Sequence, residues 1–595
     1  MDNPAPAYSR RDHADYEDDA IRDSFSTAKA HSVKLPFGFH LSDKGLFQDQ
    51  DDDKGPLLLC GPLEIVAETR DRHSTAWGVL LRWNDNDNQP HQLAVARANL
   101  AGDGREVRQL LLHGGLYVAP SIKARNALQT FLASVKIDRR ARAVARVGWA
   151  DGAFALPDRT IGISGGDLVV YQGAGTVDHE YRSAGTLAEW QEGVARHGIG
   201  NTRIAIALCA GFVGPLLEAV GGEGGGIHLR GQSSIGKSTA LLAAASIWGS
   251  PSFVRQWRAT ANGLEGIAEQ ANETLLILDE LAQLDAKEAG SIAYMLANGC
   301  GKSRASQTGD ARAARRWLTF FLSSGEISLA EHARSDGRGR RSAAGQEVRI
   351  LDIEADAGKG FGLFDSLGGL ANGDALARSI KGAAAEHYGI AGPEFVERLI
   401  GEREAQARLI RQGIDRFAND CQPADASGQV ARACRRFGLI AMAGEIATGL
   451  GILPWAPGEA TGAAKAIFAS WLLGRGGAGA AEDGAAIEQI AEFLTAHGAA
   501  RFQPIDGDGP VVIHNRAGFW RLDPMGRREY LIPATIWKAE VCRGLNVKAV
   551  SALLLERRHL FPDNAGKASV SVALPGMGKT RCYIVQQSIF GGDDA

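Results

Sequence analysis

The sequence predicts a multidomain α/β protein with a parallel sheet at its centre. Three observations lead to this fold class. Strand-like and helix-like segments alternate over residues 190–360, as a parallel sheet requires. A glycine-containing loop, GQSSIGKST at 231–239, lies between one such strand and one such helix. An alanine-rich stretch at 372–473 has the composition of packed helices.

The composition is that of a globular protein, and it narrows the classes of function. The chain has 595 residues, of which 45% are hydrophobic and 23% charged, and this length favours several domains. The net charge of −4 means that any contact with nucleic acid must come from local basic patches. The seven cysteines form no CxxC pair, so neither a zinc site nor a disulfide framework is indicated.

The sequence also indicates where in the cell the protein is located. The charged N-terminus contains no apolar run of the secretory type, and the scattered cysteines suit a reducing compartment, so we expect a cytoplasmic protein. The longest apolar stretch, 204–217, is short for a membrane span and contains Pro215. We therefore expect a buried helix there and no membrane partner.

The order of domains follows from shifts in composition. Residues 1–35 are polar and without pattern, short β-like runs and one helical stretch follow them, and the glycine-rich LGRGGAGAAEDG interrupts the C-terminal third. The predicted boundaries are a disordered tail at 1–35, an N-terminal α/β domain at 36–189, a nucleotide-binding core at 190–371, a helical region at 372–473, a linker at 474–484 and a C-terminal domain at 485–595.

The loop at 231–239 has every feature of a phosphate-binding loop. Gly231 and Gly236 have the spacing of GxxxxGK[ST], and Lys237 and Ser238 follow them. In such loops the backbone amides and the helix N-terminus face the phosphates, the lysine reaches the outer phosphates and the hydroxyl meets magnesium. We expect the nucleotide to be bound by Gly231, Ser233, Ser234, Ile235, Gly236, Lys237, Ser238 and Thr239.

A second segment, LPGMGKT at 574–580, looks similar but fails two tests. The residue five places before Gly578 is Ala573 rather than glycine, and the TRCYIVQ that follows is rich in β-formers where a helix is required. We predict instead a β-hairpin over 568–590 with LPGMGKT at its tip. The chain then has one nucleotide site.

Carboxylates for hydrolysis follow a second apolar strand. TLLILDE at 274–280 ends in Asp279, which we assign to magnesium through a water molecule, and Glu280, which would polarise the attacking water. This pair, with no guanine-reading NKxD motif, favours ATP with Mg²⁺ as the cofactor. The third strand, predicted at 317–324, would place Ser324 beside the outermost phosphate, with Glu326 nearby.

Arginines precede the last predicted core strand. Ring ATPases place an arginine there that reaches the nucleotide of the neighbouring subunit. Arg349 fits this place best, followed by Arg340 and Arg341. The alternative is a solvated basic loop.

A basic segment, 298–317, separates the carboxylates from the third strand and contains TGD as a turn. It predicts a hairpin that binds DNA phosphates in a central channel; the alternative is an exposed charged face. The donors would be Lys302, Arg304, Arg312, Arg315 and Arg316.

These motifs together resemble a known family. HLRGQSSIGKST, WRATANGLEG, LLILDELAQLD, SSGE and GQEVRILDI resemble the domain-of-unknown-function 927 family of phages, plasmids and other mobile elements, and the resemblance covers roughly 36–590. Members look like AAA+ helicases, similar to the superfamily 3 and minichromosome-maintenance helicases. The nucleotide motifs are specific, and the other stretches have no assigned role.

The resemblance implies a hexameric ring that threads single-stranded DNA. It implies that 298–317 is the hairpin before the sensor strand, with Lys302 as the DNA contact, and that Arg349 is the arginine finger. Arg432 or Arg436 would be a second nucleotide-sensing arginine, with a core salt bridge as the alternative. Asparagine is usual at the tip of the third strand, where this chain has Ser323-Ser324.

The C-terminal segment fits a winged helix, with helices in IPATIWKAEVC and VKAVSALLLERRH and the 568–590 hairpin as the wing. A purely structural subdomain is the alternative. A DNA-facing surface would be bordered by Arg557, Arg558, Lys567, Lys579 and Arg581.

The sequence therefore favours an ATP-driven DNA helicase for mobile-element replication. Its partners would be single-stranded and forked DNA, other copies of the chain, and a separate primase or other replication proteins. Two alternatives remain open: an AAA+ ATPase that loads or remodels replication proteins without unwinding, and a DNA-binding scaffold that does not hydrolyse ATP.

Overall fold

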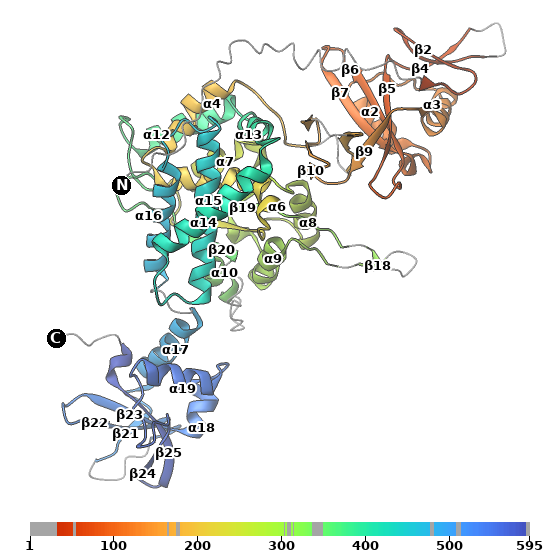
Figure 1. Ribbon diagram of the computed structural model, residues 1–595. Helices are drawn as coiled ribbons and strands as arrows, with labels where there is room; N and C mark the ends of the chain where they lie inside the picture. Colours follow the sequence, from red (N-terminus) through yellow and green to blue (C-terminus); the bar gives the residue numbers. More distant parts are fainter. Residues whose placement is uncertain are drawn as a thin grey trace.

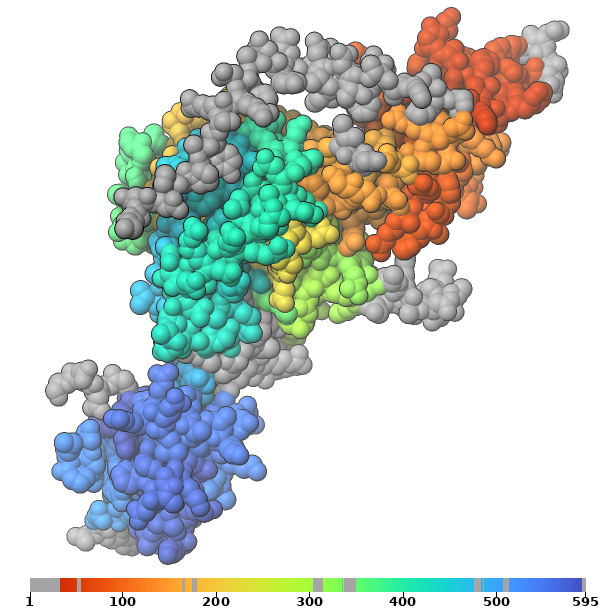
Figure 2. Space-filling view, viewed as in Figure 1, coloured from red at the N-terminus to blue at the C-terminus, as the bar shows by residue number. Residues whose placement is uncertain are grey.

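The computed structural model describes residues 33–50, 55–162, 166–173, 179–302, 304–305, 311–312, 314–335, 349–475, 481–506 and 513–590. Figure 1 shows an N-terminal part, a large central body and a C-terminal part that joins the central body through α17 (Ala481–His497). The space-filling view in Figure 2 shows the same division, with a narrow connection to the C-terminal part.

The N-terminal part is the predicted α/β unit. Its main sheet has the order β13-β9-β5-β6-β7 and consists of Leu168–Tyr171, Arg140–Val144, Glu64–Arg70, Gly78–Asn84 and Pro90–Ala96. A smaller sheet holds β2 (Phe39–Ser42), β3 (Gly45–Gln48) and β4 (Leu57–Cys60). The helices are α2 (Arg105–His113) and α3 (Ile122–Ser134). The hydroxyl of Ser121 caps α3 by accepting from the backbone N–H of Ala124, which explains why the helix begins there.

Two predicted boundaries of this part are wrong. The tail was predicted to reach residue 35, but Val33–Lys34 form β1, which pairs with β8 (Lys136–Ile137). The N-terminal domain was predicted to extend to residue 189, but several side chains after residue 147, among them Phe154, Leu156 and Tyr181, belong to the core of the central body, although β13 stays in the N-terminal sheet. Phe154, for example, stacks on Trp248 with 6.1 Å between the ring centroids. These residues are apolar on the side that meets the central helices, so they bury themselves there.

The central body is built on the predicted parallel sheet, which is confirmed. The strand order is β15 (Arg255–Gln256), β16 (Leu275–Asp279), β19 (Phe320–Gly325), β14 (Gly225–Arg230) and β20 (Ile350–Glu354), and every neighbouring pair is parallel. The strand predicted at 317–324 is β19, which begins three residues later than predicted. The carboxyl ends of parallel strands meet at one edge, where ligand sites of such sheets form.

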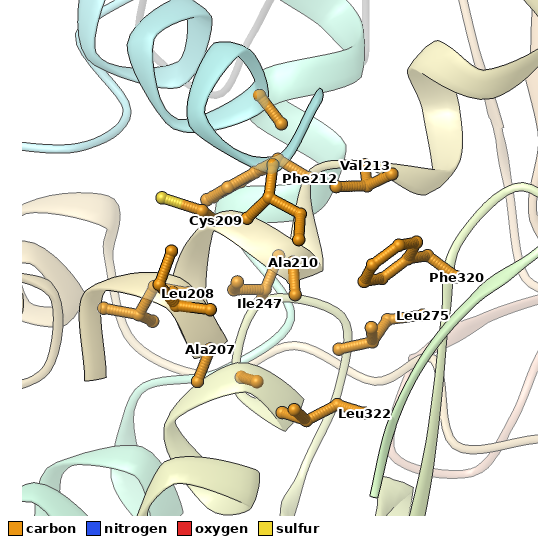
Figure 3. Close-up of a cluster of buried hydrophobic side chains, with 14 of the residues drawn as sticks. Ala207, Leu208, Cys209, Ala210, Phe212, Val213, Ile247, Leu275, Phe320 and Leu322 are labelled. Atoms are coloured by element: carbon orange, nitrogen blue, oxygen red, sulfur yellow. The ribbon is translucent and has the colours of Figure 1, made fainter. Parts of the chain in front are cut away.

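Helices cover this sheet, and one of them is the predicted buried helix. Every residue from Arg203 to Gly211 in α5 (Thr202–Gly211) is buried. Figure 3 shows side chains of α5 packed beside Leu275, Phe320 and Leu322 of the sheet. Within the described ranges no single helix is long and apolar enough to cross a membrane, and one bent pair, Thr202–Gly211 with Gly214–Val220, passes by length and composition.

The helical region is present as predicted, but it is not a separate domain. It contains α12 (Gly373–Glu386), α13 (Ala391–Leu399), α14 (Arg403–Cys421), α15 (Gly428–Gly449) and α16 (Glu459–Gly474). Its apolar side chains and those of the sheet form one continuous core, in which α5 packs against α15 and α16. The predicted domain boundary between residues 371 and 372 is therefore wrong, because the residues on its two sides share one hydrophobic core.

The C-terminal part contains the predicted helices and hairpin. Its elements are α17, β21 (Phe502–Pro504), β22 (Gly518–Leu522), β23 (Arg528–Pro533), α18 (Ala534–Ile536) continuing as a π-helix (Trp537–Val541), α19 (Val547–Glu556), β24 (Val570–Leu574) and β25 (Gly578–Val585). The linker predicted at 474–484 is shorter, because α17 begins at Ala481. One face of α17 is apolar and packs into the C-terminal core, where Ile490 and Leu494 are buried.

Candidate nucleotide site and basic hairpin

The loop between β14 and α7 (Lys237–Ala245) is shaped by its glycines. Gly231 and Gly236 have φ of 151° and 106°, a region that L side chains rarely adopt. A Cβ on Gly231 would lie 2.6 Å from Cδ1 of Ile235, so the loop closes tightly over the strand end. Ser234 adopts φ of +64°, an uncommon conformation for a residue with a side chain. The backbone between strand and helix is thus bent as a phosphate cradle requires.

Lys237 lies over this loop. Its ammonium Nζ donates to the carbonyl oxygens of Gly231 and Gln232, both at 2.6 Å. Burial lowers the pKa of Lys237, and the nearby carboxylates of Glu326 and Asp279 oppose that shift. The ammonium is therefore placed at the loop and surrounded by opposite charge.

Three predicted residues converge at the carboxyl ends of the strands. Ser238 Oγ, on the first turn of α7, lies 3.4 Å from Oδ2 of Asp279 at the end of β16. Ser324 Oγ, at the end of β19, donates to the other carboxylate oxygen of Asp279. Because β19 lies between β14 and β16, its tip stands between the loop and the carboxylate. The structure thus brings Ser324 to Asp279, and its place beside the outermost phosphate stays a prediction.

Glu280 follows Asp279 in a strained conformation. Its φ is +58°, and its carboxylate accepts a hydrogen bond from the amide of Gln283. Such backbone strain in a residue with a side chain clusters at functional sites. The side chain is exposed and lines the same cavity as the loop.

These groups line one cavity of about 890 Å³, a size suited to a nucleotide. Sequence reasoning missed the wall opposite the carboxylates, which comes from the segment after β20 and from α12. This wall consists of Asp356, Gly360, Phe361, Gly362, Phe364, Gly373, Asp374, Ala377 and Lys381. The strand order could have revealed this wall. Because β20 lies next to β14 and parallel to it, the chain after β20 leaves the sheet at the same carboxyl edge as the loop after β14.

The residues fit a magnesium–nucleotide complex. Oxygen is the ligand type that Mg²⁺ prefers, and the hydroxyl of Ser238 and a carboxylate oxygen of Asp279 lie 3.4 Å apart, so these two groups could hold the ion, Asp279 through a water molecule. Thr239 Oγ1 is buried at the cavity and makes no hydrogen bond within the described part of the chain, so it has a free donor. The described residues contain no group of three or more His, Cys, Asp or Glu that could hold a metal by protein ligands alone.

The arginines predicted to act on a neighbouring subunit do not line this cavity in the part of the chain that the structure describes. Arg349 precedes β20 at the amino edge of the sheet, where its Nε is 3.8 Å from Glu223 and its guanidinium lies 5.3 Å from the ring centroid of Tyr294. It therefore faces away from the nucleotide cavity of its own chain. Arg340 and Arg341 lie outside the described residues.

Arg436 is a correction to the prediction. Its guanidinium donates to the backbone oxygen of Arg349 at 2.6 Å, and burial lowers its pKa to about 10. It therefore lies at the amino edge, a strand length from the phosphate loop, and cannot sense the nucleotide of its own chain. Arg432, one helical turn earlier on α15, is exposed and does not line the cavity that the described residues form.

The basic segment forms the predicted hairpin. β17 (Arg304–Ala305) pairs antiparallel with β18 (Ala311–Arg312), and Arg304 and Arg312 are directly opposite. Figure 1 shows this hairpin extending from the central body, and its tip lies outside the described residues. At its base Lys302 and Arg316 are exposed, and Arg315 Nε is 3.5 Å from Glu269.

The second glycine–lysine motif lies in a hairpin tip, as predicted. Leu574 pairs with Gly578 and Ala573 pairs with Lys579 across β24 and β25, and no helix follows Lys579. The side chains that were predicted to border a DNA-facing surface are all exposed, namely Arg557, Arg558, Lys567, Lys579 and Arg581.

Comparisons with known proteins agree with this architecture. One solved structure, described as "SCCmec type IV Cch - active helicase", superposes with a TM-score of 0.64 at 18% sequence identity, covering 93% of this chain and 99% of that one. This likeness shows a shared fold. No curated protein matches the sequence. Residues 39–316, which include the phosphate loop and both carboxylates, match the model of the domain of unknown function DUF927. Over these residues the chain is similar to the DUF927 family.

Proposed function

We propose that the protein is an ATP-dependent DNA helicase of a mobile element that translocates on single-stranded DNA as a ring, with a hexamer as the expected assembly. The observation that carries the proposal is the meeting of Lys237, Ser238 and Asp279 at the carboxyl edge of the parallel sheet. These are the groups that phosphoryl transfer from a nucleotide requires.

The strand order supports an AAA+ core. The loop strand β14 and the acidic strand β16 are not neighbours, because β19 lies between them and brings the polar tip at Ser324 beside Asp279. Serine in place of the usual asparagine at this tip shortens the reach of the side chain but still supplies a hydrogen-bond donor, its hydroxyl. The fold shared with a structure described as an SCCmec helicase is consistent with this core.

The residues have distinct roles in ATP hydrolysis. Lys237 and the loop amides hold the phosphates, and Ser238 with Asp279 would hold Mg²⁺, which supplies charge neutralisation when bound. Glu280 orients the attacking water and takes its proton. Its left-handed backbone turns the carboxylate out of the strand direction and toward the cavity. Ser324 fixes the carboxylate of Asp279 and stands near the outermost phosphate.

The position of Arg349 supports an oligomer. This arginine faces away from its own cavity, so it can act on a nucleotide only in a neighbouring copy of the chain. A ring supplies such a neighbour to every subunit. Arg349 would stabilise transition-state charge across that interface. Arg340, Arg341 and Arg432 remain candidates for a second contact.

DNA binding is assigned to two basic surfaces. The hairpin β17–β18 would line the central channel, with Lys302, Arg304, Arg312, Arg315 and Arg316 as phosphate donors. The C-terminal part has the helix–helix–hairpin order of a winged helix, and its exposed hairpin carries Lys579 toward forked DNA. The proposed setting is the cytoplasm, beside a separate primase or other replication proteins.

ATP turnover separates this function from its alternatives. With Mg²⁺, the wild-type chain should hydrolyse ATP faster when single-stranded DNA is added, and Lys237→Ala should abolish turnover. Lys579→Ala is the matched control, because it removes the lysine of the second motif and should keep turnover. Stimulation only by a replication protein would favour a loader or remodeller, and absence of turnover in the wild type would favour a scaffold.

A further inference from the structure

We propose that Phe361 is the platform on which the base of the bound nucleotide stacks. This inference rests on the proposed nucleotide site and adds a residue that recognises the base. The ligand class is a nucleoside triphosphate with an aromatic base, as distinct from a bare polyphosphate.

The direction of the nucleotide in the cavity follows from the strand order. Asp279, Glu280 and Ser324 lie on the β16–β19 side of the phosphate loop, so the reacting end of the triphosphate must point to that side. The base must then point the other way, toward β20. The segments that line the cavity on that side are 356–364 and the first turns of α12.

Phe361 is an exposed aromatic side chain in this wall. Its exposed fraction is 41%, whereas Phe364, three residues later, is 1% exposed and belongs to the core. A large apolar side chain that remains exposed inside a polar cavity gains its burial only when a ligand covers it. The cavity otherwise presents five carboxylates and two lysines, which suit phosphates and Mg²⁺ but offer no face to a base.

The loop that carries Phe361 is built to present it. Gly360 and Gly362 on either side have φ of 79° and 64°, which residues with a Cβ adopt reluctantly. A Cβ on Gly362 would lie 2.6 Å from the carbonyl oxygen of Ile235 in the phosphate loop. Glycine at this position therefore allows the loop to approach the phosphate site closely.

Hydrogen bonds hold this loop in place. The N–H of Leu363 donates to the carbonyl oxygen of Ile235 at 2.8 Å, and the N–H of Ala357 donates to Gly362 O at 2.7 Å, closing the loop. Phe361 is thus fixed relative to the residues that hold the phosphates. A pre-positioned aromatic face can stack on a base without first paying an ordering cost.

The test compares two ligands that share their phosphates and differ in the base. Binding of the non-hydrolysable analogue adenylyl imidodiphosphate and of inorganic tripolyphosphate, each with Mg²⁺, is measured by calorimetry on the full chain. Phe361→Ala should weaken binding of the nucleotide analogue by roughly 5- to 160-fold, the range for loss of one base–aromatic stack. Binding of tripolyphosphate should change by less than about twofold, since stacking does not act on it.

Two further variants complete the design. Phe361→Trp should retain nucleotide affinity, because its ring also stacks. Phe561→Ala removes an aromatic residue that is 44% exposed on the C-terminal part and should change neither affinity. Equal losses for both ligands in Phe361→Ala, or no loss for either, would overturn the assignment of Phe361 alone. A wild-type chain that binds neither ligand would overturn the proposed nucleotide site as well.

Discussion

Replacing Glu273 by glutamine is expected to stabilise the protein in a pH-dependent way. Glu273 lies in the turn between α8 (Ala261–Gln270) and β16, and its Oε2 accepts the backbone N–H of Trp149 at 2.7 Å. This bond joins the segment that leaves the N-terminal part to the central body. Burial raises the pKa of Glu273 from 4.5 to about 7.

The size and sign of the effect follow from these values. Because the folded pKa is raised, the contribution of Glu273 to stability is fully present below pH 4.5 and is lost as the pH rises through 7. The pKa differs between the unfolded and folded states, from 4.5 to about 7, and each pKa unit corresponds to about 1.4 kcal/mol. The ionised side chain therefore lowers the free energy of unfolding by roughly 3 kcal/mol above pH 7. Glu273→Gln keeps an oxygen for the N–H of Trp149 and has no charge to bury.

Melting temperatures from calorimetry between pH 4.5 and 8 measure this effect. Glu273→Gln should match the wild type near pH 4.5 and melt higher at pH 8, by on the order of 5 °C. Glu273→Ala also removes the charge but leaves the N–H of Trp149 without its acceptor, which costs about 1–3 kcal/mol, so it should gain less. A difference between Gln and Glu that is constant with pH, or a less stable Gln variant at pH 8, would refute the reasoning.

Three further predictions concern turnover and DNA. Glu280→Gln should bind Mg²⁺–ATP as the wild type does and hydrolyse it at least about 100-fold more slowly, because the base is lost; near-normal turnover would contradict its role. Arg349→Ala should lose roughly 1,000-fold in turnover, and mixing it with Lys237→Ala should restore activity, since one subunit supplies the loop and the other the arginine; a mixture as inactive as its components would exclude action between subunits. Lys302→Ala should reduce the slope of log affinity for single-stranded DNA against log salt by about 0.7, as expected for one lost phosphate contact; an unchanged slope would remove Lys302 from the interface.

The features that the sequence predicted correctly are local. The turn between β14 and α7 was predictable from glycines spaced within nine residues between a strand-like and a helix-like run, and the strand that ends in Asp279 is a continuous apolar run. The hairpin at 568–590 was predictable because alternation and a PG turn lie within one short segment. In each case the residues that determine the structure are neighbours in the chain.

The features that the sequence did not predict depend on distant contacts. Arg432 and Arg436 occupy equivalent faces of α15, and only the packing of that helix along the sheet places Arg436 at Arg349 O. The domain boundaries at 189 and 371 failed because apolar residues on both sides of them share one core. Phe361 is separated from Lys237 by more than 120 residues, so no local pattern joins them to one cavity.

Strand displacement tests the central claim most directly. A forked DNA duplex with single-stranded arms is incubated with ATP, Mg²⁺ and the wild-type chain, Lys237→Ala or Lys579→Ala. The account predicts that the wild type and Lys579→Ala each separate the strands, although loss of one basic contact slows Lys579→Ala, while Lys237→Ala does not separate them. No strand separation by the wild type, with its ATP hydrolysis intact, would contradict a helicase and leave a loader or remodeller. Unwinding by Lys237→Ala at the wild-type rate would contradict the proposal that ATP bound at the loop 231–239 drives strand separation.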